Sequence, residues 1–297
     1  MQIETLDLQY RGVPRVIASY LIDGPDGPVL VETGPGSTLP TLIAALKDHG
    51  VSPGDIQHVL VTHIHLDHAG AAGWWAGQGA TVYAHPFGAP HLVDPRKLID
   101  SATRIYGDQM DTLWGDILPA PAEKVVPIED GDVLELSGLT FRVLETPGHA
   151  RHHHVYQLED IAFTGDAAGI QLPGSPWIDV PAPPPEFDLE AWEVTIEKIR
   201  QLDCSTLYPT HYGATTDVDT QLDGLEVALV EAVDFVRSMM DQGLDREQMV
   251  EGYGTRLQDR FAGLSLSPEL MQAFEFSNPM AMSVTGISRY LSKLSRN

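Results

Sequence analysis

Cysteine is almost absent from this chain. The 297 residues include a single cysteine, Cys204, which cannot form a disulfide within the chain. The fold must therefore be held together by its core, as is usual in cytosolic proteins, and we interpret Cys204 as a small buried hydrophobic residue. The N-terminal residues MQIETLDLQY also lack a basic stretch followed by an apolar one. We therefore expect no signal peptide and predict a cytoplasmic protein.

Positive charge and long apolar stretches are scarce as well. Lys and Arg together number 18 against 42 Asp and Glu, which leaves a formal net charge of −24. Such an acidic surface repels nucleic-acid phosphates and anionic lipids. The longest run without a charged residue, 69–93, contains five glycines and two prolines, which a membrane-spanning helix does not tolerate so densely. We predict neither a nucleic-acid nor a membrane partner.

The composition is that of a folded globular protein. Apolar residues make up 43% of the chain and charged residues 20%, both close to globular averages. Strands that feed two sheets, with helices on the outside, predict a layered α/β sandwich. The expected strands are 2–9, 15–22, 29–32, 58–62, 124–127, 132–136, 139–145, 153–158, 161–164 and 205–208, and the expected helices are about 39–49 and 188–202.

The C-terminal part of the chain follows a different pattern. From about residue 215 the strand signals vanish, and we predict a helical extension over 214–297 after a first domain over 1–213. Its apolar stripe is expected to pack on the first domain, with a homodimer seam through these helices as the alternative. The segments 100–121 and 170–187 are interpreted as long irregular connections, which often form lids or binding walls. The stripe consists of Leu222, Leu225, Leu229, Ala232, Val236 and Met240.

Seven side chains with metal-binding atoms follow predicted strands. Ligands that sit just after separate strands can converge on one point. Imidazole and carboxylate groups suit zinc, iron or manganese, and a carboxylate can bridge two ions. Seven such groups are enough for two divalent ions, for which zinc is the first choice. The groups are His63, His65, Asp67 and His68 in THIHLDHAG, His149 in ETPGHA, Asp166 in FTGDA and His211 in YPTHYG.

This motif and the order of the later ligands resemble the metallo-β-lactamase superfamily over about residues 1–213. The resemblance implies an αββα sandwich that forms a catalytic domain with its site at the sheet edge. The helical tail and bridging aspartate are more similar to glyoxalase II-type hydrolases than to antibiotic-degrading lactamases. The resemblance also implies one metal on His63, His65 and His149, a second on Asp67, His68 and His211, and Asp166 as the bridge between them.

One position departs from the family pattern. Glu32, in VETGPG, stands where the family usually has aspartate. Two interpretations stay open: a carboxylate that supports a metal ligand, or a solvated turn residue. Among the remaining histidines we interpret His49, His58 and His91 as structural, and His85, His152 and His153 as structural or ligand-supporting groups.

The resulting hypothesis is a dinuclear metallo-hydrolase acting on a small molecule. Hydroxide held by the two ions would attack the carbonyl of a small thioester, ester or lactone. Asp67 is the candidate for orienting the attacking water. Trp177, in the segment 170–187, is the predicted apolar contact of the substrate, and the alternative is a tryptophan that packs this loop down.

Two other activities stay open. Persulfide dioxygenases share the fold and, by resemblance, place a single iron on His63, His149 and Asp166. Acyl-homoserine lactonases are a weaker match, because their tyrosine three residues after the bridging aspartate corresponds to Gly169 here.

Overall fold

Two β-sheets form the centre of this computed structural model, which describes residues 2–295. One sheet contains six strands in the order β1-β2-β3-β4-β5-β6, and the other contains five in the order β11-β10-β9-β8-β7. The strands β3 to β6 pair in parallel, as do β10 and β11, and the other pairs are antiparallel. Their bounds are β1 Gln2–Asp7, β2 Ala18–Gly24, β3 Gly27–Val31, β4 His58–Leu60, β5 Thr81–Ala84, β6 Val125–Pro127, β7 Val133–Leu136, β8 Leu139–Glu145, β9 His154–Leu158, β10 Ile161–Gly165 and β11 Thr206–Pro209.

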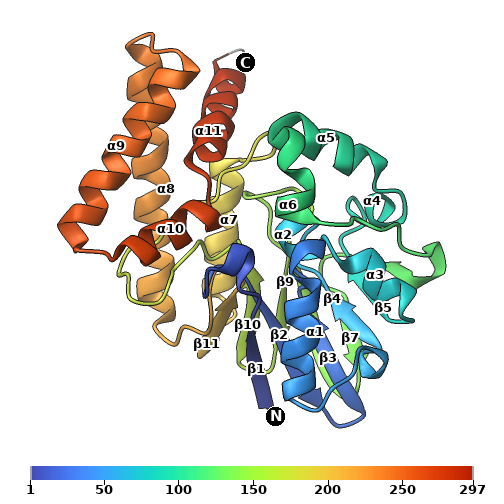
Figure 1. The fold of residues 1–297 in the computed structure, drawn as a ribbon. Helices are drawn as coiled ribbons and strands as arrows, with labels where there is room; N and C mark the ends of the chain where they lie inside the picture. The colour runs from blue at the N-terminus through green and yellow to red at the C-terminus, as the bar shows by residue number, and fades with distance from the viewer. Residues whose placement is uncertain (1, 296–297) are drawn as a thin grey trace.

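Helices cover the outer faces of both sheets (Figure 1). The helices α1 to α6 connect strands β3 to β6 of the six-stranded sheet. Helix α7 connects β10 and β11 of the other sheet. The helices are α1 Leu39–Asp48, α2 Leu66–Ala69, α3 Ala72–Gly77, α4 Ala89–Val93, α5 Arg96–Tyr106, α6 Met110–Trp114, α7 Leu189–Arg200, α8 Val218–Asp241, α9 Arg246–Leu264, α10 Pro268–Ser277 and α11 Met280–Leu294.

The layering follows from the alternation of side chains along each strand. In β3, Val29 and Val31 point into the space between the sheets, whereas Leu30 points to the helices outside. In β10, Phe163 lies between the sheets and Ala162 faces the helices on the opposite side. Both faces of these strands are buried, so most of their residues are apolar. The predicted αββα sandwich is confirmed.

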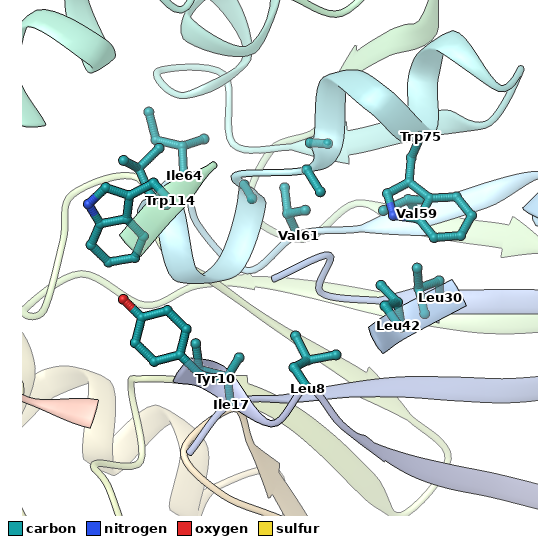
Figure 2. Close-up of a cluster of buried hydrophobic side chains, with 14 of the residues drawn as sticks. Leu8, Tyr10, Ile17, Leu30, Leu42, Val59, Val61, Ile64, Trp75 and Trp114 are labelled. Carbon is teal, nitrogen blue, oxygen red and sulfur yellow. The ribbon is translucent and has the colours of Figure 1, made fainter. Parts of the chain in front are cut away.

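The core outside the six-stranded sheet also reaches the loops above it (Figure 2). Leu42 from α1 and Trp75 from α3 pack over Leu30 and Val59 of the sheet. At the other end of the same cluster, Trp114 at the end of α6 stacks with the ring of Tyr10 at a centroid distance of 6.1 Å. One continuous apolar cluster therefore holds the loops over the sheet edge.

The C-terminal helices share a core with the five-stranded sheet. Leu222, Leu225 and Leu229 of α8 are buried in the same cluster as Trp192 and Ile196 of α7. The predicted helical extension is confirmed, and its apolar stripe packs within the chain as expected. Within residues 2–295, none of the helices has the length and apolar character needed to cross a bilayer.

The prediction that 100–121 is irregular was wrong. Residues 96–106 form α5 and residues 110–114 form α6. The helical spacing of Leu98, Ala102 and Ile105, with polar residues between them, is present in the sequence and is the pattern of an amphipathic helix. The segment 170–187 does lack a helix, and its first residue, Ile170, forms an isolated antiparallel bridge with Asp179 near its middle.

A glycine allows α11 to lie against the proline-rich segment 181–185. A Cβ atom at Gly286 would stand 2.0 Å from the backbone oxygen of Ala182, which is far inside contact distance. By contrast, a Cβ at Gly263 in α9 would meet no atom within 4 Å. Close contact between α11 and the segment 181–185 therefore requires glycine at position 286.

We expect Gly286→Ala to destabilise the protein by about 1–3 kcal/mol, because the added methyl group forces two backbones apart. The control Gly263→Ala should be neutral or slightly stabilising, because alanine is the better helix former. Chemical denaturation of both variants checks this. Equal stability of the two variants would contradict the close packing of α11.

A buried carboxyl group joins the segment 170–187 to the turn between α10 and α11. Asn278 donates hydrogen bonds of 2.9 Å to Asp179 Oδ2 and to the Val180 carbonyl, and Ser283 Oγ donates to Asn278 Oδ1. Burial raises the pKa of Asp179 to about 6, although the hydrogen bond from Asn278 opposes the shift.

The raised pKa of Asp179 makes a prediction for stability against pH. The folded protein holds this proton more tightly than the unfolded chain, where the pKa is about 3.9. Stability is therefore lost as pH rises from about 4 to above 6, by up to about 3 kcal/mol. Asp179→Asn should gain stability relative to the unaltered protein between pH 4.5 and 7.5 in denaturant titrations. The exposed Asp241→Asn variant is the control. If the stability of Asp179→Asn ran parallel to that of the unaltered protein over this pH range, the raised pKa of Asp179 would be contradicted.

Candidate metal centre

The seven predicted ligands all lie at one end of the sandwich, after the C-terminal ends of strands. His63 and His65 follow β4, and Asp67 and His68 lie in the short helix α2 that comes next. The other three follow β8, β10 and β11, and these are His149, Asp166 and His211. Strands from both sheets therefore deliver ligands to the same place, as the sequence predicts.

One group of three nitrogens is already spaced for a metal ion. The Nε2 of His63, the Nδ1 of His65 and the Nε2 of His149 lie 2.8–3.2 Å from one another. Ligands of a tetrahedral zinc ion at about 2.0–2.1 Å stand roughly 3.3 Å apart. Three neutral imidazoles at this spacing fit one divalent ion.

A second group lies beside the first. His211 Nε2 is 3.4 Å from Asp67 Oδ2, and His68 Nε2 is 3.9 Å from the same oxygen. Asp166 stands between the two groups. Its Oδ1 is 3.4 Å from His68 Nε2 and 3.7 Å from His211 Nε2, while its Oδ2 is 3.3 Å from His149 Nε2. One carboxylate thus turns one oxygen to each group.

The opposite ring nitrogens are held by the protein. His149 Nδ1 lies 2.7 Å from the Pro181 carbonyl, and His211 Nδ1 lies 2.6 Å from the Val16 carbonyl. A carbonyl oxygen can only accept, so each Nδ1 carries the proton and each Nε2 keeps a free lone pair. Such hydrogen bonds orient imidazoles toward a metal ion.

Glu32 supports a ligand. It is fully buried, and its Oε1 is 3.1 Å from His68 Nδ1. The same oxygen accepts hydrogen bonds from the hydroxyl groups of Thr62 and Thr210, which lie after β4 and β11. The interpretation of Glu32 as a solvated turn residue was wrong. The longer side chain fills the supporting position and joins both sheets to the second ligand group.

Buried atoms without partners indicate what is suited to the centre. Within residues 2–295, His68 Nε2, His211 Nε2 and Asp166 Oδ1 are buried and have no hydrogen bond. A buried polar atom without a partner is costly. All three atoms belong to the second group and to the carboxylate beside it. Their chemistry and placement fit a divalent cation.

The electrostatics differ between the two groups. Burial lowers the pKa of His63, and it lowers that of His149 to about 4. Burial also acts to lower the pKa of His68 and His211, but Asp166 and Asp67 outweigh it and raise both above their ordinary value. The carboxylates therefore favour positive charge in the second group, which is the property that also favours a divalent metal ion there.

Some of the other histidines support the centre. The Asp166 backbone N–H donates to His153 Nε2, and the other ring nitrogen of His153 lies 2.8 Å from Thr146 Oγ1. His153 thus positions the carboxylate between the two groups. His85 pairs with Glu145 at 3.2 Å and lies outside the three ligand groups.

Glycine at 165 permits this arrangement. It has φ of +51°, and a Cβ there would stand 2.4 Å from Thr62 Oγ1 and 2.7 Å from His153 Nε2. Only glycine brings the end of β10 this close to its neighbours. Its place before Asp166 in the sequence signals this requirement.

A cavity of about 600 Å³ opens directly onto the ligands. His65, Asp67, His149 and Asp166 form part of its wall. The cavity also includes His91, which sequence reasoning took as structural, and residues 181 and 183–186 of the proline-rich segment.

Trp177 lies away from this cavity. Its ring packs at 5.0 Å from Phe274 of α10 and 5.4 Å from Phe261 of α9, measured between centroids. The structure therefore places it as the tryptophan that packs the loop down, and the substrate contact predicted for it has no support here. The sequence around Trp177 contains nothing that distinguishes a substrate contact from a tryptophan that packs the loop.

Comparisons with known proteins agree with this geometry. The family model described as Metallo-beta-lactamase superfamily matches residues 12–211. The metallo-beta-lactamase fold-containing protein ST1585 of Sulfurisphaera tokodaii is 25% identical over 204 residues, which cover 67% of this chain and 74% of that protein. An atrochrysone carboxyl ACP thioesterase of Aspergillus fumigatus is 26% identical over 208 residues, which cover 69% of this chain but 39% of that protein.

Solved structures show the same fold. The metallo-beta-lactamase family protein TTHA1429 of Thermus thermophilus superposes with a TM-score of 0.71 at 22% identity. The match covers 99% of this chain and 94% of the other, so it includes the C-terminal helices.

The contacts of Glu32 make a prediction about metal affinity. We expect Glu32→Gln to weaken metal binding about 10- to 100-fold, because the amide lowers the basicity of His68 and loses charge. Competition with a coloured chelator measures this. The exposed Glu129→Gln is the matched control, and equal affinities in the two variants would rule out a supporting role for Glu32.

Proposed function

Because this chain belongs to the metallo-β-lactamase superfamily, we propose that it is a metal-dependent hydrolase with two divalent ions, zinc first among them, that cleaves a small thioester, ester or lactone. One observation carries the proposal. Asp166 directs one oxygen to His68 and His211 and the other to His149. A carboxylate in this place joins two complete ligand groups.

The residues divide into two sets. His63, His65 and His149 would hold one ion, and Asp67, His68 and His211 the other. Ions at such a site polarise a carbonyl, stabilise developing oxyanions and lower the pKa of water toward 7. The ligand groups themselves contain neither a serine nor a cysteine nucleophile. Cys204 is buried and outside these groups, and burial raises the pKa of its thiol to about 11.

Asp67 is suited to orient the attacking water. Its side chain is 23% exposed, whereas Asp166 and the neighbouring histidines are almost fully buried. It also forms part of the cavity wall. Burial acts to raise the pKa of Asp67, but His68 and His211 outweigh it and lower that pKa to about 2, so the group is an acceptor at neutral pH. A carboxylate at the cavity wall can accept a hydrogen bond from a water molecule and so orient that water for attack.

The thioester is the favoured member of this substrate class. A thioesterase is among the relatives of this chain, although the match covers only 39% of that protein. A lactonase-type tyrosine is excluded at position 169, because a Cβ at Gly169 would already stand 2.8 Å from Ile178. The glyoxalase II-like character that the helical tail suggested remains part of this proposal.

The competing proposal is a mononuclear iron dioxygenase. The second ligand group favours the dinuclear hydrolase over a single iron, because Asp67, His68 and His211 lie close enough together to hold another ion. Metal analysis combined with oxygen uptake separates the two activities. One iron with oxygen consumption supports the dioxygenase, and two metals with acid release support the hydrolase.

Substitution of Asp166 is the most direct test of the two-metal proposal. Asp166→Ala should reduce tightly bound metal from two ions toward one or none and lower kcat by several orders of magnitude, because no other carboxylate among residues 2–295 reaches both groups. Metal quantification and thioester hydrolysis measure the two effects. The exposed Asp241→Ala serves as control. An Asp166→Ala protein with two metals and near-normal turnover would refute the dinuclear assignment.

A further inference from the structure

The cavity beside the ligands is much larger than the reacting carbonyl requires. Its volume of about 600 Å³ lies within the range of pockets that enclose whole small molecules. One side belongs to α5 and α6 and the other to the end of α10 and the start of α11. In Figure 1 these helices flank α2, which carries Asp67 and His68. The walls therefore come from segments about 170 residues apart in the chain.

One wall is a single face of α5. The helix turns Leu98, Ser101, Ala102 and Ile105 to the cavity, at steps of three and four residues or their neighbours. This is the spacing of one helix stripe. Most of these side chains are apolar or small, and Lys97 beside them adds one charged group, so this wall offers mainly apolar contact area.

Apolar side chains on this wall are left open to the cavity. Ile105 is 48% exposed, and Phe87, which precedes α4, is 43% exposed. Both belong to the cavity wall. An exposed apolar patch beside a reactive centre is typical of a surface that a ligand covers. The Arg151 guanidinium lies over the Phe87 ring, 4.6 Å from its centroid, and helps to hold the ring in place.

The facing wall is mainly apolar, although Glu275 and its polar neighbours at 277–278 also line it. Phe276 at the end of α10 and Met282 in α11 form it, together with prolines of the segment 181–185. Phe276 is held by an edge contact with Tyr10 at 6.3 Å between centroids and by the Arg11 guanidinium at 4.1 Å from its ring. This wall is therefore fixed before any ligand enters.

We propose that this cavity is an acyl pocket, which selects thioesters or esters with a bulky, apolar acyl group over short ones. The inference rests on the proposed hydrolase function and names its substrate class. Thiol carriers and alcohol leaving groups are polar and gain little from apolar walls. An acyl chain gains about three- to fourfold in affinity for each buried methylene. The carbonyl then lies at Asp67 and His149, and the acyl group extends between α5 and Phe276.

A substitution that fills the pocket tests this selection. Ser101 is exposed, lies on the cavity wall and belongs to no apolar core. Ser101→Phe should therefore place a ring in the cavity without disturbing folding. The control is Thr103→Phe, which adds similar bulk to an exposed position of the same helix outside the cavity wall.

The experiment measures kcat/KM for acetyl, hexanoyl, decanoyl and naphthoyl thioesters of N-acetylcysteamine, with metal content determined for each protein. The unaltered protein should prefer decanoyl or naphthoyl over acetyl by at least about tenfold. Ser101→Phe should remove most of that preference, because the added ring lowers kcat/KM for the decanoyl and naphthoyl thioesters far more than for the acetyl thioester. Thr103→Phe should behave like the unaltered protein.

Binding of decanoic acid and naphthoic acid, measured by calorimetry, separates the two proposals. Binding that Ser101→Phe weakens at least tenfold, without hydrolysis of any thioester, would retain the acyl pocket and refute the thioester as the substrate of the centre. Hydrolysis with equal rates for acetyl and decanoyl thioesters, or an equal loss for both in Ser101→Phe, would refute the acyl pocket and retain the hydrolase.

Discussion

The placement of the Asp166 carboxylate is the constraint on which the rest of the centre depends. Its two oxygens lie 3.3–3.7 Å from histidine nitrogens of different ligand groups. A small displacement of this carboxylate would therefore remove the one negative charge that both groups share. The protein fixes it from behind through the His153 ring, which accepts from the Asp166 backbone N–H. Gly165 makes the approach possible, because any side chain there would collide with Thr62 and His153. The carboxylate is thus held by backbone geometry as well as by charge.

The sandwich serves this centre by bringing strand ends from two sheets together. Alternating side chains form three apolar layers, one between the sheets and one between each sheet and its helices. The polar ligands lie at the edge where the strands end. Glu32 shows how closely the sheets are joined there. It follows β3, contacts His68 in α2, and accepts hydrogen bonds from Thr62 and Thr210 near strands of different sheets. A buried carboxylate is tolerable because each neighbour donates to it or carries charge.

The C-terminal helices contribute to the site as well as to the core. α8 buries its apolar stripe against α7, while the turn between α10 and α11 reaches the cavity. Asn278 in that turn binds Asp179 and Val180, so the turn and the proline-rich segment form one wall. The packing of Trp177 against both Phe261 and Phe274 joins the same segment to α9 and α10. Stability of the extension and shape of the cavity are therefore coupled.

The sequence by itself determined the layered fold and which His and Asp side chains meet at one end of it, because alternation along strands and the position of His and Asp after strands are local properties. It could not separate the two interpretations of Glu32, since burial and the contact with His68 depend on residues 36 to 178 positions away. The same holds for Trp177, whose aromatic partners lie on distant helices. The stripe of α5 is shared between the core, where Ala102 is buried, and the cavity, where Ser101 and the exposed Ile105 lie, and the sequence does not distinguish the two environments. Only the tertiary structure decided these roles, because they are set by contacts between segments that the chain order does not bring together.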